Sequence, residues 1–217
     1  MPIFTKNGRR VLFVHIPKTA GSSVYLMFAA NGWQISHLDT RPAKGRVGYD
    51  LLHRYGVTPE RGPLQSLEGP VRIQHVSYET WSQWGEYYDE AFNFARHPED
   101  RFISAVRFQH RHIKTDETLP AFAQRFMSGL NRAFRKGQRT FRDNHFRPQS
   151  EFVGPESVVF NLARGGMSEM CTRYGLTRDI DAFSNQTHGA LVLSEQQRAW
   201  VNKIYDIDFK TFVFEKR

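Results

Sequence analysis

The feature that most constrains the fold is an uninterrupted apolar run, VLFVHI at 11–16, which stops at Pro17. Apolar runs without polar alternation are typical of parallel strands that are buried on both faces of a sheet. The segment that follows, 22–32, carries apolar residues at helical spacing and closes with Gly32, which favours helix termination. The sequence therefore predicts a strand, a tight loop and a helix in direct succession.

The rest of the chain repeats this alternation of strands and helices. The stretch 40–70, rich in Gly, Pro and Arg, is expected to be an irregular excursion. The alternation favours an α/β fold, with one three-layer domain over 1–217 built around a mostly parallel central sheet. We expect further strands at 71–76, 91–96 and 157–162, and helices from Pro98 and at 118–130, 165–174 and 194–205.

The loop between the first strand and the first helix has the chemistry of an anion cradle. In open α/β sheets, ligands bind beyond the carboxyl ends of the strands, which is where HIPKTAGSS (15–23) lies. Gly21 allows close approach of the backbone, Ser22 and Ser23 begin a helix whose free N–H groups can hold an anion, and Lys18 adds a cation. An ordinary strand-to-helix turn with a surface lysine is the alternative reading of these residues taken alone.

The order of residues in this loop excludes the nucleotide-triphosphate loop, in which the lysine follows the second glycine. Instead, HIPKTAGSS resembles the 5′-phosphosulfate-binding loop of the Golgi-type carbohydrate sulfotransferases and their bacterial relatives, with a serine in place of a usual threonine. The resemblance implies a P-loop-like sulfotransferase fold and 3′-phosphoadenosine-5′-phosphosulfate (PAPS) as donor. It implies that Lys18 contacts the oxygen that bridges phosphate and sulfur. The 5′-phosphate would be held by the loop as a whole: Pro17, Lys18, Thr19, Ala20, Gly21, Ser22 and Ser23.

A second candidate phosphate site is ARHPEDRFISA (95–105), which follows the third predicted strand. Arg96 is expected at the strand end and Ser104 in the second turn of the next helix, so both can face the same crevice. A bidentate guanidinium and a hydroxyl suit a terminal monophosphate, although a capping arginine and a packed serine would look the same. The segment resembles the family's 3′-phosphate motif, which implies that Arg96 and Ser104 bind that phosphate. Arg101 also matches a family position, and we expect it to pair with a nearby carboxylate.

Sulfuryl transfer to an alcohol requires a group that takes the hydroxyl proton, and histidine is best suited near neutral pH. His75 is expected at the end of the strand 71–76, on the edge of the sheet that carries the phosphate loop. The segment QHVSY resembles the family's G-H-x-x-[FY] element, with Gln74 in place of the glycine, which implies that His75 is the general base. His15 precedes the loop and is expected to be structural.

Three further segments extend the resemblance across most of the chain. DNHFRPQSEFV (143–153) resembles an [HN]-[WF]-x-P-Q element of the carbohydrate subgroup, in which His145 could contact the acceptor or the segment could brace a loop. SNQTH (184–188) and the stretch 195–214 resemble a loop that returns toward the nucleotide and a closing helix with its tail. The segments 35–70 and 107–142 have no match in the family pattern.

The positive charge is concentrated in one part of the chain. The formal net charge is +8, and residues 101–150 hold 11 Lys and Arg against three acidic residues, which accounts for the whole surplus. Such a block attracts an anionic partner, or is a solvated basic face. If it lines the acceptor cleft, the acceptor is an anionic saccharide with a free hydroxyl. Arg107, Arg111 and Lys114 extend beyond Ser104 on the same predicted helix, and Arg111, two turns along nearly the same face, is the best single candidate to reach the acceptor.

Composition also bears on the compartment and on other classes of function. Cys171 is the only cysteine, so no intrachain disulfide or thiolate-rich metal site can form, and no His/Asp/Cys spacing suggests a metal cofactor. We expect a soluble, cytoplasmic protein, since neither a secretion signal nor an integral membrane segment is recognisable. The alternative to an enzyme is a non-catalytic basic module that binds nucleic acid or a polyanionic glycan. We expect no nucleic-acid partner, because no stacking-aromatic signature accompanies the basic residues.

Overall fold

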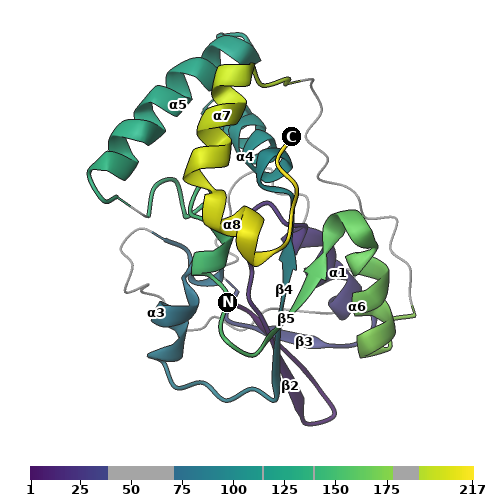
Figure 1. The fold of residues 1–217 in the computed structure, drawn as a ribbon. Coiled ribbons are helices and arrows are strands. Elements are labelled where there is room, and N and C mark those ends of the chain that lie inside the picture. The colour runs from purple at the N-terminus through teal and green to yellow at the C-terminus, as the bar shows by residue number, and fades with distance from the viewer. Residues whose placement is uncertain (39–70, 114, 139, 178–190) are drawn as a thin grey trace.

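A computed structural model describes residues 1–38, 71–113, 115–138, 140–177 and 191–217 of the chain. It has a central sheet with helical layers on both sides (Figure 1), as the alternation of strands and helices predicted. The predicted excursion 40–70, the SNQTH loop at 184–188 and Lys114 lie outside the described residues.

The described part of the chain forms one sheet with the strand order β3-β1-β2-β4-β5. The strand β1 is antiparallel to both of its neighbours, whereas β2, β4 and β5 pair in parallel. Among these strands β1 alone therefore runs against the others, which confirms a mostly parallel sheet. The strands are β1 (Ile3–Lys6), β2 (Arg9–Phe13), β3 (Gln34–Ser36), β4 (Glu90–Ala95) and β5 (Ser157–Asn161).

The strand predicted at 11–16 is the second arm of a hairpin. Asn7 and Gly8 form the turn with φ values of 50° and 81°, which matches the left-handed pair that a two-residue hairpin needs. β2 ends at Phe13, before the end of the apolar run, although the Val14 N–H still donates to the Phe92 carbonyl oxygen at 2.8 Å. The remaining residues of the run leave the sheet and lead into the phosphate loop.

Aromatic side chains fill the space between one face of the sheet and its helices. Figure 1 shows α1 (Gly21–Ala30) and α6 (Gly166–Tyr174) together on this side. Phe28 of α1 stacks on Phe4 of β1 with ring centroids 4.0 Å apart, and Phe92 of β4 lies beside both. The burial of these rings holds α1, and with it the preceding loop, against the sheet.

The other face of the sheet is covered by α3 (Tyr78–Ser82) and by the segment around Phe152. Trp81 is buried there in one cluster with the strand residues Ile3, Leu12 and Ala91. A third cluster lies among the helices α4, α5, α7 and α8 and includes Phe102, Phe122 and Tyr205. These helices span Pro98–Ile113, Leu119–Arg135, Glu195–Ile204 and Asp206–Thr211. No helix in the described ranges is long and apolar enough to cross a membrane.

The strand predicted at 71–76 is wrong. The segment forms a short 3₁₀ helix, η1 (Ile73–His75), in which the His75 N–H donates to the Arg72 carbonyl oxygen at 2.8 Å. The Arg72 N–H donates to a carboxylate oxygen of Asp143 at 2.7 Å. Because local and side-chain acceptors satisfy these amides, the segment needs no neighbouring strand. Two further 3₁₀ turns complete the elements, η2 (Gln149–Glu151) and η3 (Leu162–Arg164).

Candidate active site

The phosphate loop is held in a strained backbone conformation. Lys18 and Ala20 have φ values of 71° and 68°, a left-handed conformation that costs a residue with a side chain about 1–2 kcal/mol. Between them, Thr19 is fully buried and its hydroxyl donates to the Ile16 carbonyl oxygen at 2.7 Å. The Gly21 and Ser22 N–H groups, the first of α1, follow directly after Ala20, and the Ser23 and Val24 N–H groups donate to the Ala20 carbonyl oxygen at 3.0 and 3.1 Å. Strain of this kind persists where a ligand site requires it.

His15, near the end of the first apolar run, packs against this loop at Gly21. A methyl group on Gly21 would lie 2.0 Å from the His15 Nε2, so only glycine lets the ring and the loop come this close. The His15 ring stacks on Phe13, and its Nδ1 is hydrogen-bonded to the Tyr25 hydroxyl. Burial holds the pKa of His15 well below its ordinary value, so the ring is neutral. The structure thus places His15 in the packing under the loop, as predicted.

Arg96 connects the second phosphate motif to the first. It directly follows β4, and its guanidinium donates to the carbonyl oxygen of Lys18 at 3.2 Å. Its backbone is bracketed by Gln149, whose amide oxygen accepts from the Arg96 N–H at 3.0 Å and whose amide nitrogen donates to the Arg96 carbonyl at 2.8 Å. Burial lowers the pKa of Arg96, and the nearby charge of Arg107 lowers it further.

Ser104 and Arg107 lie one turn apart on α4, the helix that begins two residues after Arg96. Ser104 is buried in the second turn of the helix, as expected from its spacing. The Nε atom of Arg107 is buried and has no hydrogen-bond partner among the described residues. Arg107 follows Ser104 by three positions, as the helix expected from the sequence requires, but the sequence assigned it no contact with the nucleotide. Two guanidinium groups close enough to influence each other suit a dianionic phosphate.

The amine of Lys18 lies over an aromatic ring contributed by α4. Its Nζ atom is 4.4 Å from the centroid of Phe108, in a cation–π contact. The ring of His145 stacks on Phe108 with centroids 4.9 Å apart. The His145 Nδ1 lies 2.6 Å from the Arg142 carbonyl oxygen, to which its N–H donates. Burial lowers the pKa of His145 to about 3, so the ring is a neutral wall beside Lys18.

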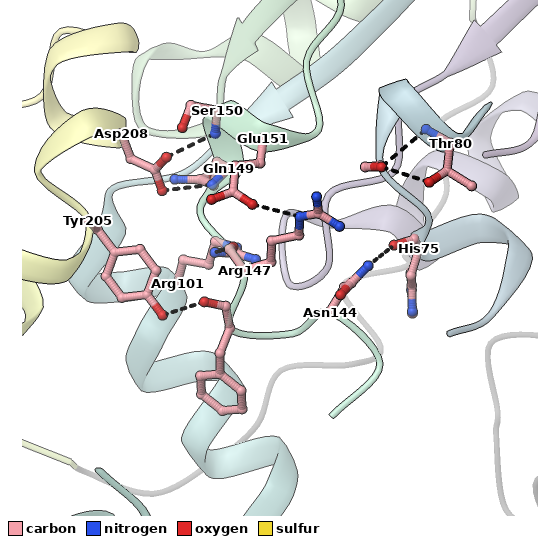
Figure 2. Close-up of polar contacts among 12 residues, drawn as sticks. His75, Thr80, Arg101, Asn144, Arg147, Gln149, Ser150, Glu151, Tyr205 and Asp208 are labelled. Carbon is pink, nitrogen blue, oxygen red and sulfur yellow. Dashed lines mark hydrogen bonds and ion pairs between the residues drawn. The ribbon is translucent and has the colours of Figure 1, made fainter. Parts of the chain in front are cut away.

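His75 lies in the same cluster of rings, although it comes from a 3₁₀ turn and not from a strand. Its ring centroid is 4.7 Å from that of His15 and 5.4 Å from that of His145. Its Nδ1 is 2.8 Å from a carboxylate oxygen of Asp143. Figure 2 shows its carbonyl oxygen accepting from the Asn144 side-chain amide, at 2.9 Å. His15 links His75 to the phosphate loop, because it touches Gly21 on the other side.

Asp143 contacts His75, and the sequence did not single it out. It lies in a run of three consecutive left-handed residues, with φ values of 53°, 59° and 59° at Arg142, Asp143 and Asn144. This conformation turns the side chains of both Asp143 and Asn144 toward His75. Asp and Asn tolerate the left-handed region better than most residues, so D-N at 143–144 was a weak signal for such a turn.

Arg101 is structural, but the carboxylate pair predicted for it is wrong. It is buried, and its guanidinium donates to three backbone carbonyl oxygens, at 2.9 Å to Pro17, 2.9 Å to Arg147 and 3.3 Å to His145. Hydrogen bonds from a charged donor to buried carbonyl oxygens are stronger than those from a neutral donor. One side chain therefore fastens the start of the phosphate loop to the segment that carries Asp143 and His145.

The segment 143–152 braces the site, which was one of the two roles left open for it. Asp208 of α8 accepts from the Gln149 N–H at 2.8 Å and the Ser150 N–H at 2.9 Å, and the Tyr205 hydroxyl donates to the Phe146 carbonyl oxygen at 2.8 Å (Figure 2). Asp208 is fully buried, and burial raises its pKa. The C-terminal helices thus hold the segment from the outside.

The structure brings most of the predicted site residues together and leaves one apart. Lys18, His75, Arg96 and His145 are joined by the contacts above, with Ser104 on the adjacent helix. Arg111 is exposed near the end of α4, about 10 Å along the helix from Ser104 at 1.5 Å per residue. The described residues include no group of three or more His, Cys, Asp or Glu that could hold a metal ion.

Comparison with known proteins identifies the family of the chain. Neither the curated proteins nor the solved structures gave a match to the chain. The sequence does match the family model described as the sulfotransferase family, over residues 1–215. This match spans both phosphate motifs, the segment of His75 and the bracing helices of the C-terminal part. The chain therefore belongs to the sulfotransferase family.

Proposed function

We propose that the protein transfers the sulfuryl group of PAPS to a hydroxyl of a carbohydrate acceptor. The observation that carries the proposal is the hydrogen bond from Arg96 to the carbonyl oxygen of Lys18, at 3.2 Å. It joins the candidate 3′-phosphate site to the candidate phosphosulfate loop across 78 residues of sequence. A donor that carries phosphate groups at both its 3′ and 5′ positions fits two anion sites that touch.

In the proposed complex each end of the nucleotide has its own set of donors. The N–H groups at the start of α1 and the hydroxyls of Ser22 and Ser23 hold the 5′-phosphate. Arg96 and Ser104 hold the 3′-phosphate. Arg107, one turn beyond Ser104 on α4, supplies a second guanidinium.

The transfer itself requires a base and a cation at opposite ends of the reacting axis. His75 takes the proton of the acceptor hydroxyl while the hydroxyl oxygen forms a bond to sulfur. The bond from sulfur to the bridging oxygen breaks in line, and Lys18 stabilises the negative charge that develops on that oxygen. The products are the sulfated acceptor, adenosine 3′,5′-bisphosphate and a proton on His75, which passes to solvent.

For the acceptor we propose an anionic saccharide. Arg111 is an exposed cation two turns along α4 from the nucleotide site, where it can meet a carboxylate or sulfate on the sugar. His145 and Phe108 form a neutral aromatic surface next to Lys18, against which a sugar ring can lie.

Replacing Lys18 with Ala tests the proposal. We expect turnover of PAPS with a saccharide acceptor to fall by at least about 10²-fold, because the leaving oxygen loses its cation. Circular dichroism should show an unchanged fold, since Lys18 is on a loop and is partly exposed. The matched control is Lys136→Ala, which removes an exposed lysine after α5 and should leave turnover unchanged.

The same proteins distinguish an enzyme from a non-catalytic basic module. Calorimetry should show saturable binding of adenosine 3′,5′-bisphosphate that persists at high salt, since its sites are partly buried. Weak binding that declines steeply with salt, together with unaltered behaviour of the Lys18 variant, would favour the basic module and contradict the proposed transfer.

A further inference from the structure

The two carboxylate oxygens of Asp143 serve two different partners. One lies 2.8 Å from Nδ1 of His75, and the other accepts from the backbone N–H of Arg72 at 2.7 Å. We propose that Asp143 is a positioning residue that fixes the tautomer of His75, with the hydrogen on Nδ1 and a free lone pair on Nε2. The inference rests on the proposed function, in which His75 is the base.

The tautomer follows from the hydrogen-bonding capacity of the groups. An ionised carboxylate can only accept hydrogen bonds, so Nδ1 of His75 must be the donor. A neutral imidazole carries one hydrogen, and with that hydrogen on Nδ1 the Nε2 atom is left to accept a proton. When the proton arrives, the carboxylate is already in place to stabilise the imidazolium.

Other contacts hold the ring in one orientation. The Asn144 amide donates to the His75 carbonyl oxygen, and the rings of His15 and His145 meet the His75 ring edge-on. Among the described residues, the charged and titratable groups near the His75 ring include Asp143, His15, His145, Arg72 and the N-terminal ammonium group, which donates to the Ile73 carbonyl oxygen. The Arg72 Nε lies 3.6 Å from the same oxygen that His75 uses.

The second partner of Asp143 makes an isosteric substitution informative. In Asp143→Asn the side chain has one oxygen and one NH₂ group, which must be shared between the same two partners. The backbone N–H of Arg72 cannot accept a hydrogen bond, so the oxygen must face it and the NH₂ must face His75. The His75 Nδ1 then has to accept, which moves its hydrogen to Nε2 and blocks the base.

We expect an unusual order of activities. Asp143→Asn should lower kcat by about 10²–10⁴-fold, because the imposed tautomer cannot take a proton. Asp143→Ala should be at least tenfold more active than Asp143→Asn, since it leaves both tautomers of His75 accessible. A purely structural carboxylate predicts the opposite order, because Asn keeps its shape and Ala does not. Asp116→Asn, an exposed acidic residue of the same basic stretch, is the matched control and should be unchanged.

Nitrogen NMR of the histidine rings gives a readout that does not depend on turnover. The His75 signals should show hydrogen on Nδ1 in the parent protein and on Nε2 in Asp143→Asn, each at a pH where the ring is neutral. Hydrogen on Nε2 in the parent, or the same tautomer in both proteins, would overturn the inference. A tautomer change without loss of turnover would instead show that His75 is not the base, which contradicts the proposed mechanism and leaves the positioning geometry correct.

Discussion

A histidine side chain, as well as any bound phosphate, requires a glycine at position 21 of the phosphate loop. The ring of His15 occupies the space in which a Cβ of Gly21 would lie, 2.0 Å from Nε2. His15 in turn is fixed by Phe13 and Tyr25, so it cannot move aside without disturbing the core. The loop and the ring below it therefore form one packed unit.

Gly21→Ala should consequently destabilise the protein. We expect a loss of about 1–3 kcal/mol from overpacking, seen as a melting temperature lower by roughly 2–12 °C. The control is Gly129→Ala, in the exposed interior of α5 with open space around it, which should stabilise the helix by about 0.5–1 kcal/mol. Equal thermal shifts in the two variants would show that the close contact with His15 has no energetic consequence.

Single residues also show where sequence reasoning reaches its limit. The positions of Lys18 and Arg96 in the fold could be predicted because each follows a strand, where local spacing determines the environment. Asp143 could not, because its role depends on a left-handed turn and on a partner 68 residues away. Arg101 was identified as structural but given the wrong partner, since backbone carbonyls leave no pattern in a sequence.

Among the elements, the segment 143–152 does the most to organise the site. It carries Asp143 and His145 at one end and Gln149 at the other, where the Gln149 side chain brackets the backbone of Arg96. Asp208 holds it through two N–H groups. Displacement of this segment would therefore disturb both the proposed base, His75, and the proposed 3′-phosphate site at Arg96.

Asp208→Asn tests this dependence. An amide supplies one acceptor for two buried N–H donors, so one donor loses its partner, at about 1–3 kcal/mol. We expect a lower melting temperature and weaker binding of adenosine 3′,5′-bisphosphate, both measured by thermal shift with and without the nucleotide. Asp206→Asn, on the same helix but in partly exposed ion pairs with Lys210 and Lys216, should change little. Unchanged nucleotide affinity in Asp208→Asn would separate the brace from the site.

The elements themselves were predictable to different degrees. The start of α4 and both ends of α6 were predicted within one residue, because the apolar positions of these helices have a helical period. The short strands β1 and β3 were missed, although the Asn7-Gly8 turn marks the hairpin. The apolar residues of the segment 71–76 are buried, but in a 3₁₀ turn and its flanking loops. A short apolar segment of this kind is also typical of a strand, so the sequence alone could not distinguish the two.

For the molecule as a whole, the basic surplus is distributed over several surfaces. Within the described part of the stretch, Arg101 is buried, Arg125 pairs with Glu117, and Arg147 pairs with Glu151. The helix α5 carries further arginines on the part of the molecule away from the sheet (Figure 1). The described basic residues of this stretch therefore do not line a single cleft. The effect of each one on acceptor binding has to be tested separately.

Arg111→Ala should raise the Michaelis constant for an anionic saccharide by about two- to fivefold, with little change for PAPS. Added salt should reduce this difference, because it screens exposed charges. Arg132→Ala, an exposed arginine of α5, is the control and should leave both constants unaltered. A neutral saccharide used as well as its carboxylated counterpart would contradict the proposed acceptor class.

The brace from Asp208 has a consequence for the order in which the protein becomes competent. During synthesis the phosphate loop leaves the ribosome nearly 190 residues before α8. The loop is held by Arg101, which also binds the segment 143–152, and that segment is in turn held by Asp208 of α8. Contacts between such distant positions form late and slow the search for the native state. A nascent chain therefore contains the whole loop sequence long before the loop is fastened in place. If the loop binds the proposed donor nucleotide, binding would report that the last helix has docked.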